Sequence, residues 1–164
     1  MASAEAEAAL AACIDAQSLQ LWTASRPVPA ALGRLYLTRA PALGLRQPLR
    51  ADGRGALRAQ TQAACDEFVQ RGRTRLRRFD GLFGRSGIAQ LKVLAPDPGS
   101  RLFGGFVDPD IFVGLRLCWR DSLPFKATGQ QGDIDYRTLG EELRREWDAL
   151  LPGIRPIPMS EFET

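Results

Sequence analysis

Histidine is absent from this chain of 164 residues. Without imidazole, the chain lacks the side chain that most often acts as a general base near neutral pH. The absence also excludes nucleophile pairs of serine or cysteine with histidine, and metal sites built on imidazole. The sequence leaves enzymatic activity open but favours a protein without one, and we predict that it uses no cofactor and no metal.

Cysteines and long apolar runs are also scarce. Cys13, Cys65 and Cys118 are widely spaced and odd in number, as expected for reduced thiols that are buried as small apolar groups. No apolar run approaches the ~20 residues that cross a bilayer. The acidic residues near the start of the chain do not fit a secretory or transit signal. We predict a single domain over residues 1–164, in the cytoplasm and without membrane contact.

Lysine is rare, because Lys92 and Lys126 are the only two among 22 basic residues. The others are arginines, whose planar guanidinium can bind phosphate or carboxylate with two parallel hydrogen bonds. Residues 41–94 hold eleven basic and four acidic side chains, whereas residues 95–164 hold eight basic and twelve acidic ones. The basic middle and the acidic end can form two separate faces or neutralise each other.

Apolar residues at helical spacing predict three helices. Ser3 is a suitable N-cap for an N-terminal helix, which should stop before the Arg26–Pro27 step. A long central helix is predicted over about 54–80 and a C-terminal helix over about 135–151. The C-terminal helix has the most regular apolar stripe, formed by Tyr136, Leu139, Leu143, Trp147 and Leu150.

Alternating residues over about 88–120 predict an antiparallel meander of three to four strands. Segments 101–107 and 111–120 flank Asp108-Pro109-Asp110, a sequence typical of a hairpin turn. Residues 32–38 fit a strand or a helical turn, and we favour the strand. The short connections argue against parallel winding. The predicted fold class is therefore α+β, with the meander packed by the helices.

The long strand of this hairpin has two unlike faces. We expect the core face to hold Ile111, Val113, Leu115, Leu117 and Trp119. The opposite, mixed face then holds Phe112, Gly114, Arg116, Cys118 and Arg120.

Arginine is densest between residues 71 and 85, where phenylalanines lie close by in the sequence. Basic clusters with aromatic residues can follow a phosphate backbone and stack on bases. The predicted nucleic-acid-binding or anion-binding residues are Arg73, Arg77, Arg78, Arg85, Arg116 and Arg120. The competing interpretation of the basic segment is a solvated helix face that pairs with the acidic C-terminal helix through Glu141, Glu142, Glu146 and Asp148. For Arg116 and Arg120 the competing interpretation is a cross-strand ion pair or a half-covered sheet.

Two Asp-X-Asp spacings, Asp108–Asp110 and Asp133–Asp135, resemble magnesium ligands in type. Both lie where aspartate has a local role in a turn or a helix cap. We therefore expect no metal there. Gly81, Gly84 and Gly87 do not form a phosphate loop, because no strand is predicted before them and no Gly-Lys-Ser/Thr follows.

The layout of residues 54–150, a long helix, a meander with arginines and a final helix, resembles the RelE/ParE toxin superfamily. The resemblance implies a ribonuclease that works with arginine, lysine and tyrosine instead of depending on histidine. Arg78, Arg116 and Tyr136 are of these types.

We therefore expect a small non-enzymatic binding or accessory protein that meets nucleic acid or an acidic protein through its basic middle. One alternative is a RelE/ParE-like ribonuclease-type toxin. Another is a homo-oligomeric small-molecule binder with an apolar pocket walled by the meander and by Trp22, Trp119 or Trp147.

Overall fold

The computed structural model describes residues 2–28, 30–47, 53–72, 78–82, 86–123 and 135–162. In chain order its elements are α1 (Ala4–Asp15), β1 (Gln20–Leu21), β2 (Arg34–Leu37), α2 (Arg39–Arg46), α3 (Gly55–Arg71), β3 (Phe79–Gly81), β4 (Ile88–Val93), β5 (Ser100–Asp108), β6 (Ile111–Trp119), η2 (Arg120–Ser122), α4 (Tyr136–Leu150) and η3 (Met159–Glu161).

Within the described residues, six strands form one mixed sheet in the order β1-β2-β6-β5-β4-β3. Strands β3 to β6 form an antiparallel meander, and β2 pairs in parallel with β6. The predicted α+β class is confirmed, and the strand favoured at residues 32–38 is present as β2. The predicted antiparallel meander of three to four strands agrees only roughly with this sheet, which has six strands and includes a parallel pair that the short connections did not predict. Strands β1 and β3 span only two and three residues, too few to show an alternating pattern in the sequence.

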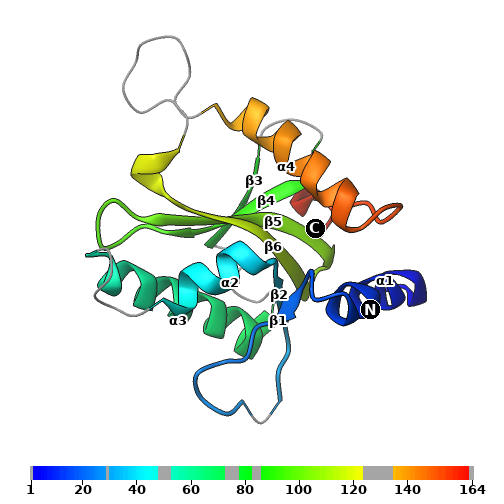
Figure 1. Ribbon diagram of the computed structural model, residues 1–164, viewed down its shortest axis with the longest axis horizontal. Helices are drawn as coiled ribbons and strands as arrows, with labels where there is room; N and C mark the ends of the chain where they lie inside the picture. Colours follow the sequence, from blue (N-terminus) through cyan, green and yellow to red (C-terminus); the bar gives the residue numbers. More distant parts are fainter. Residues whose placement is uncertain are drawn as a thin grey trace.

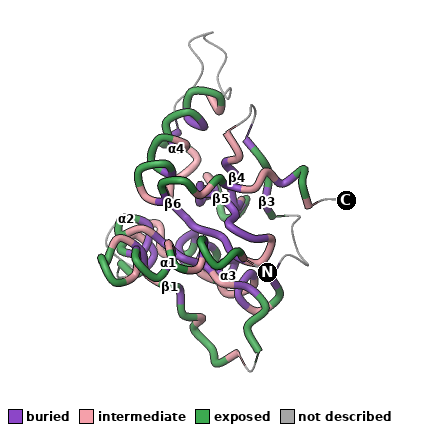
Figure 2. The backbone as a smooth tube through the Cα atoms, turned by 90° about the vertical axis from the view of Figure 1, so that its right-hand side faces the viewer, coloured by how far each residue is buried: buried purple, intermediate pink, exposed green. Residues whose placement is uncertain are grey.

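Helices cover both faces of the sheet, with α4 on one side and α2 and α3 on the other (Figure 1). Residues of α1 and α4 share one buried apolar cluster with Phe103 and Val113. Residues of α2 and α3 share a second cluster with Phe106 and Phe112. The sheet between them is mostly buried along β5 (Figure 2). No helix in this described part of the chain is long and apolar enough to cross a membrane.

The first and last helices begin as the sequence predicts. The Ser3 hydroxyl accepts a hydrogen bond from the Ala6 amide at 3.1 Å, and the Asp135 carboxylate accepts one from the Thr138 amide at 3.0 Å. The first helix is shorter than expected, because Gln17 adopts a positive φ of 59° just beyond it. This left-handed conformation ends a helix.

The central helix ends at Arg71 and does not reach residue 80. Gly72 follows with a φ of 57°, and a Cβ there would lie 2.7 Å from Asp110 Oδ1, so this position requires glycine. Phe79 continues the helical spacing in the sequence but lies in β3, where it pairs with Leu91. A prediction made from the apolar spacing alone therefore makes this helix too long.

The predicted hairpin is confirmed, with Asp108 paired to Ile111 across its turn. The predicted faces of β6 are wrong in its second half. The register shifts between Phe103 and Gly104, which face Arg116 and Gly114, so that Leu115 is the extra residue of a β-bulge.

The bulge turns two consecutive side chains, Leu115 and Arg116, toward α4. From there on the alternation is inverted. Leu117 and Trp119 pack with the cluster of α2 and α3, whereas Cys118 packs on the α4 side. Both faces of β6 are covered, and the division into a core face and a mixed face failed because it assumed unbroken alternation across the bulge.

Candidate functional site

Three of the six arginines predicted to bind an anion, Arg73, Arg77 and Arg85, lie outside the described residues. The structure places the other three, Arg78, Arg116 and Arg120, at separate points.

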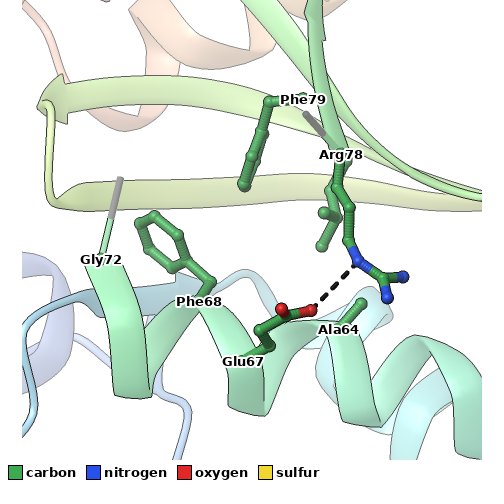
Figure 3. Close-up of a pocket in the computed structure, with 7 residues that line it drawn as sticks. Ala64, Glu67, Phe68, Gly72, Arg78 and Phe79 are labelled. Carbon is green, nitrogen blue, oxygen red and sulfur yellow. Dashed lines mark ion pairs between the residues drawn. The ribbon is translucent and has the colours of Figure 1, made fainter. Parts of the chain in front are cut away.

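Arg78 points toward α3 from just before β3 (Figure 3). Its Nε lies 3.1 Å from Glu67 Oε2, and its side chain is 47% exposed. The cavity beside this pair, where Phe68 and Phe79 meet, has a volume of about 10 Å³. That is room for about one water molecule, which excludes a small-molecule site at this place.

Arg116 lies on the other side of the sheet and faces α4. Its guanidinium forms ion pairs with Glu146 and with Glu142, the latter at 3.5 Å. Burial is the largest single influence on the pKa of Arg116 and lowers it, but the hydrogen bond to Glu146 and the nearby negative charges, those of Glu146 and Glu142 among them, together outweigh burial and hold this pKa above the ordinary value. Arg78 and Arg116 therefore do not form one site with Tyr136, as the resemblance to the toxins would require.

Arg120 begins the short helix η2, and its backbone amide donates to the Gly99 carbonyl at 2.9 Å. Among the described residues, no carboxylate forms an ion pair with its half-buried side chain.

The acidic residues of α4 are paired with arginines outside the basic segment 71–85. Besides the two glutamates on Arg116, Glu141 lies 3.8 Å from Arg137, and Asp148 lies 3.0 Å from Arg144. Of the arginines in segment 71–85, the structure describes Arg71 and Arg78, and both pair with Glu67 of α3.

The Asp-X-Asp spacings have local roles. Asp108 Oδ1 accepts from the Asp110 amide at 3.2 Å within the hairpin turn, and Asp135 caps α4. Asp133 lies outside the described residues. Within the described ranges, no group of three or more histidine, cysteine or acidic side chains could hold a metal ion. The absence of a metal in the working protein stays a prediction.

A polar site that the sequence analysis missed lies on the α4 side of the meander. Asp80 of β3 stands opposite Gln90 of β4, and Lys92 of β4 stands opposite Arg101 of β5. Directly opposite residues of antiparallel strands share a face, as do residues two apart on one strand. The four side chains therefore form two neighbouring rows on one face.

These rows are part of the wall of a cleft of about 380 Å³. The cleft is completed by Gly81, the last residue of β3, by Leu82 just beyond it, and by Tyr136, the first residue of α4. Its charged groups are the cations of Lys92 and Arg101 and the carboxylate of Asp80, which forms an ion pair with Lys92. One positive charge remains in excess.

Two side chains of this cleft are buried with polar atoms that have no partner. Gln90 is 6% exposed and Arg101 is 5% exposed. Arg101 Nη1 donates to the carbonyls of Ser100 at 2.8 Å and Val93 at 3.4 Å, but its Nε has no acceptor in the part of the chain that the structure describes. Gln90 Oε1 has no donor. Buried polar groups are paired in the great majority of native structures, so these two atoms mark a place where a partner is missing.

The sequence carried a signal for this cleft. Gln90 and Lys92 are polar residues two apart in an otherwise apolar strand, and residues 96–100 (PDPGS) have a composition typical of a turn. Folding the chain back at that turn brings Lys92 opposite Arg101.

A second hollow, of about 620 Å³, lies along the edge strand β1 and is lined by Ile14, Gln17, Leu19, Gln20, Leu21, Arg39 and Leu43. Leu21 and Leu43 are 48% and 52% exposed there. Neither hollow is lined by Trp22, Trp119 or Trp147, the tryptophans predicted to wall an apolar pocket. Trp147 is instead a fully buried residue of α4. Trp119 lies beneath the guanidinium groups of Arg54 and Arg58.

No protein family model, characterised protein or solved structure matches this chain. The candidate site therefore stands on its geometry alone.

Proposed function

We propose that this protein is a binding protein whose cleft between β3, β4, β5 and the start of α4 holds a small ligand with an anionic group. The observation that carries the proposal is the buried guanidinium of Arg101, which has an unpaired Nε. Among the described residues, it forms no ion pair with a carboxylate.

A buried charge is costly unless it is paired and hydrogen-bonded. Two backbone carbonyls satisfy part of the Arg101 guanidinium, but they carry no net charge. A phosphate or carboxylate in the cleft would accept from Nε and at the same time meet the ammonium of Lys92 opposite. The cleft volume of about 380 Å³ is within the range of about 300–1,000 Å³ that is usual for small-molecule sites.

Titration calorimetry with inorganic phosphate and with acetate tests this proposal on the protein and on Lys92→Met. The substitution removes one cation of the cleft while keeping a side chain of similar length. We expect Lys92→Met to weaken anion binding by about tenfold or more, the loss expected for a charge-assisted hydrogen bond. Arg155→Gln is the control, because Arg155 is 66% exposed, pairs with Glu161 and does not line the cleft.

The proposal is wrong if neither anion binds at millimolar concentration. It is also wrong if Lys92→Met and Arg155→Gln bind equally well.

A second candidate function is contact with nucleic acid, or with an acidic protein, through the basic segment 71–85. One observation favours it: the four acidic residues of α4 pair with Arg116, Arg137 and Arg144. The carboxylates expected to neutralise the basic segment are thus engaged elsewhere. Arg78, which pairs with Glu67, is not available to this surface without breaking that pair.

The ribonuclease function implied by the resemblance to RelE/ParE toxins stays a prediction. Growth arrest on expression, together with cleavage of RNA by the purified protein, would support it.

A further inference from the structure

We infer that the ligand of the cleft is an anionic sugar, whose phosphate or carboxylate binds at Lys92 and Arg101 and whose hydroxyl groups bind at Gln90 and Asp80. This inference rests on the proposed function and adds the chemical class of the ligand.

The Gln90 amide is the first reason. Its Oε1 is buried without a donor, and the side chain lines the cleft. An amide both donates and accepts hydrogen bonds, and so does a hydroxyl group. A hydroxyl is therefore a partner that satisfies this amide in either orientation. An anion can only accept from the amide NH₂ group, and an ammonium ion can only donate to the amide oxygen.

The second reason is the pair of acceptors that Gln90 forms with Asp80. The two residues stand opposite each other on neighbouring strands. The Asp80 side chain is 50% exposed, whereas Gln90 is buried. An ionised carboxylate can only accept, and its two oxygens can take hydrogen bonds from neighbouring hydroxyls of one ligand. Tyr136 adds an aromatic ring and a phenolic hydroxyl to the same wall.

The third reason is the spacing of the two rows. Gln90 and Lys92 are two residues apart on β4, and two residues of an antiparallel strand span about 7 Å. The hydroxyls of the ligand must therefore lie several bonds from its anionic group. A simple amino acid carries its ammonium and carboxylate on one carbon, which is too close to reach both rows. The carbon chain of a sugar phosphate or a sugar acid has the required length.

The experiment compares ligands that differ only in their hydroxyl groups. Binding of ribose 5-phosphate, methyl phosphate and uncharged ribose is measured by calorimetry on the protein and on Gln90→Met. We expect ribose 5-phosphate to bind about tenfold more tightly than methyl phosphate, as one or two additional hydrogen bonds would provide. Gln90→Met should abolish this advantage, so that ribose 5-phosphate and methyl phosphate bind this variant with similar affinity. Ribose alone should bind too weakly to measure.

Two further arms complete the design. Binding of glucuronate is compared with binding of acetate, and this comparison shows whether the ligand is a sugar acid instead of a sugar phosphate. Gln60→Met is the matched control, because Gln60 is exposed on α3, away from the cleft. If Gln90→Met does not fold, Gln90→Asn shortens the amide by one methylene and should reduce the advantage of the sugar ligand.

The inference is overturned if neither sugar ligand binds more tightly than its matched simple anion. It is also overturned if the advantage persists in both Gln90 variants. In either case the proposed function stands as long as methyl phosphate binds in a Lys92-dependent way. If no anion binds at all, the proposed function itself has failed.

Discussion

The arginines of this protein differ in the groups that pair with their guanidinium. Arg34 faces the carboxylate of Glu7, and hydrogen bonding between them raises the pKa of Arg34 and lowers that of Glu7. Arg58 is 1% exposed, donates from Nε to the Gly44 carbonyl at 2.7 Å and lies over the ring of Trp119. Arg101 has carbonyl partners and one free buried donor, and this difference singles out the cleft.

The pair of Glu7 and Arg34 should make stability depend on pH in the acidic range. The pKa of the Glu7 carboxyl is lowered from an ordinary value of 4.5, mainly by the hydrogen bond from Arg34. A carboxyl with a depressed pKa stabilises the fold above its unfolded-state pKa, and this contribution disappears as pH falls through the lowered value. Thermal unfolding of the protein and of Glu7→Gln should differ at pH 7 and converge below pH 4. A difference that persists unchanged at pH 3 would contradict this account.

Trp147 is the second test at the residue scale. Its side chain is fully buried between α4 and the sheet, and its Nε1 donates to the Ile154 carbonyl at 2.6 Å. Truncating a buried aromatic side chain costs about 3–5 kcal/mol, and we expect Trp147→Ala to lower the free energy of unfolding by that amount. Urea unfolding measures it. Trp119→Ala is the control, and this half-buried ring should cost less. Equal losses would argue against the core position of Trp147.

At the scale of elements, the bulge in β6 decides which side chains reach α4. Because Leu115 is the extra residue, Arg116 joins the α4 side and meets Glu142 and Glu146. Without the bulge, Arg116 would point toward the apolar cluster of α2 and α3. The bulge is accompanied by a very close approach of β5 and β6 at Gly104.

Gly104 should therefore tolerate no side chain. A Cβ at this position would lie 1.9 Å from the Val113 carbonyl oxygen, a clash with backbone that no side-chain rotation relieves. We expect Gly104→Ala to lower the free energy of unfolding by about 1–3 kcal/mol or more, since overpacking usually costs this much. Gly81→Ala is the matched control, because a Cβ in β3 meets nothing within 4 Å. Similar denaturation midpoints for the two variants would contradict the close approach.

At the scale of the whole molecule, charge is distributed unevenly between segments. Residues 41–94 carry an excess of seven basic groups, and α4 satisfies its acidic residues with other arginines. We propose a small anion as the ligand of the cleft lined by Lys92 and Arg101, and the sequence of segment 71–85 suits a polyanion. Different experiments separate the two, since a small anion and a nucleic acid differ in how strongly salt affects their binding.

If the basic segment binds nucleic acid, affinity should fall log-linearly with salt. Each phosphate contact adds about 0.9 to the slope on duplex DNA, or about 0.7 on single strands. Replacing Arg73 and Arg77 together by alanine should weaken binding equally for all sequences and flatten the slope, because backbone contacts carry no sequence information. Gel-shift titrations with mixed-sequence RNA and DNA measure both effects.

The control is Arg137→Ala combined with Arg155→Ala, which removes the same charge at two sites that are 85% and 66% exposed. No binding at tens of micromolar protein, or equal losses in the two double variants, would remove the nucleic-acid function.

The sequence by itself determined the features that depend on neighbouring residues. Ser3 and Asp135 cap their helices because the acceptor and the amide are three residues apart, and α4 shows its buried stripe at Leu139, Leu143 and Trp147 through the helical period. The turn at Pro109 and Asp110 is equally local.

The tertiary structure alone decided the rest. The bulge at Leu115 depends on the register between β5 and β6, and only the folded chain brings Gly72, at the end of α3, next to Asp110 of the hairpin turn. The cleft depends on strand pairing that brings Asp80, Gln90, Lys92 and Arg101 onto one face, and on α4 closing over them, because burial is a property of the assembled layers and not of any one segment.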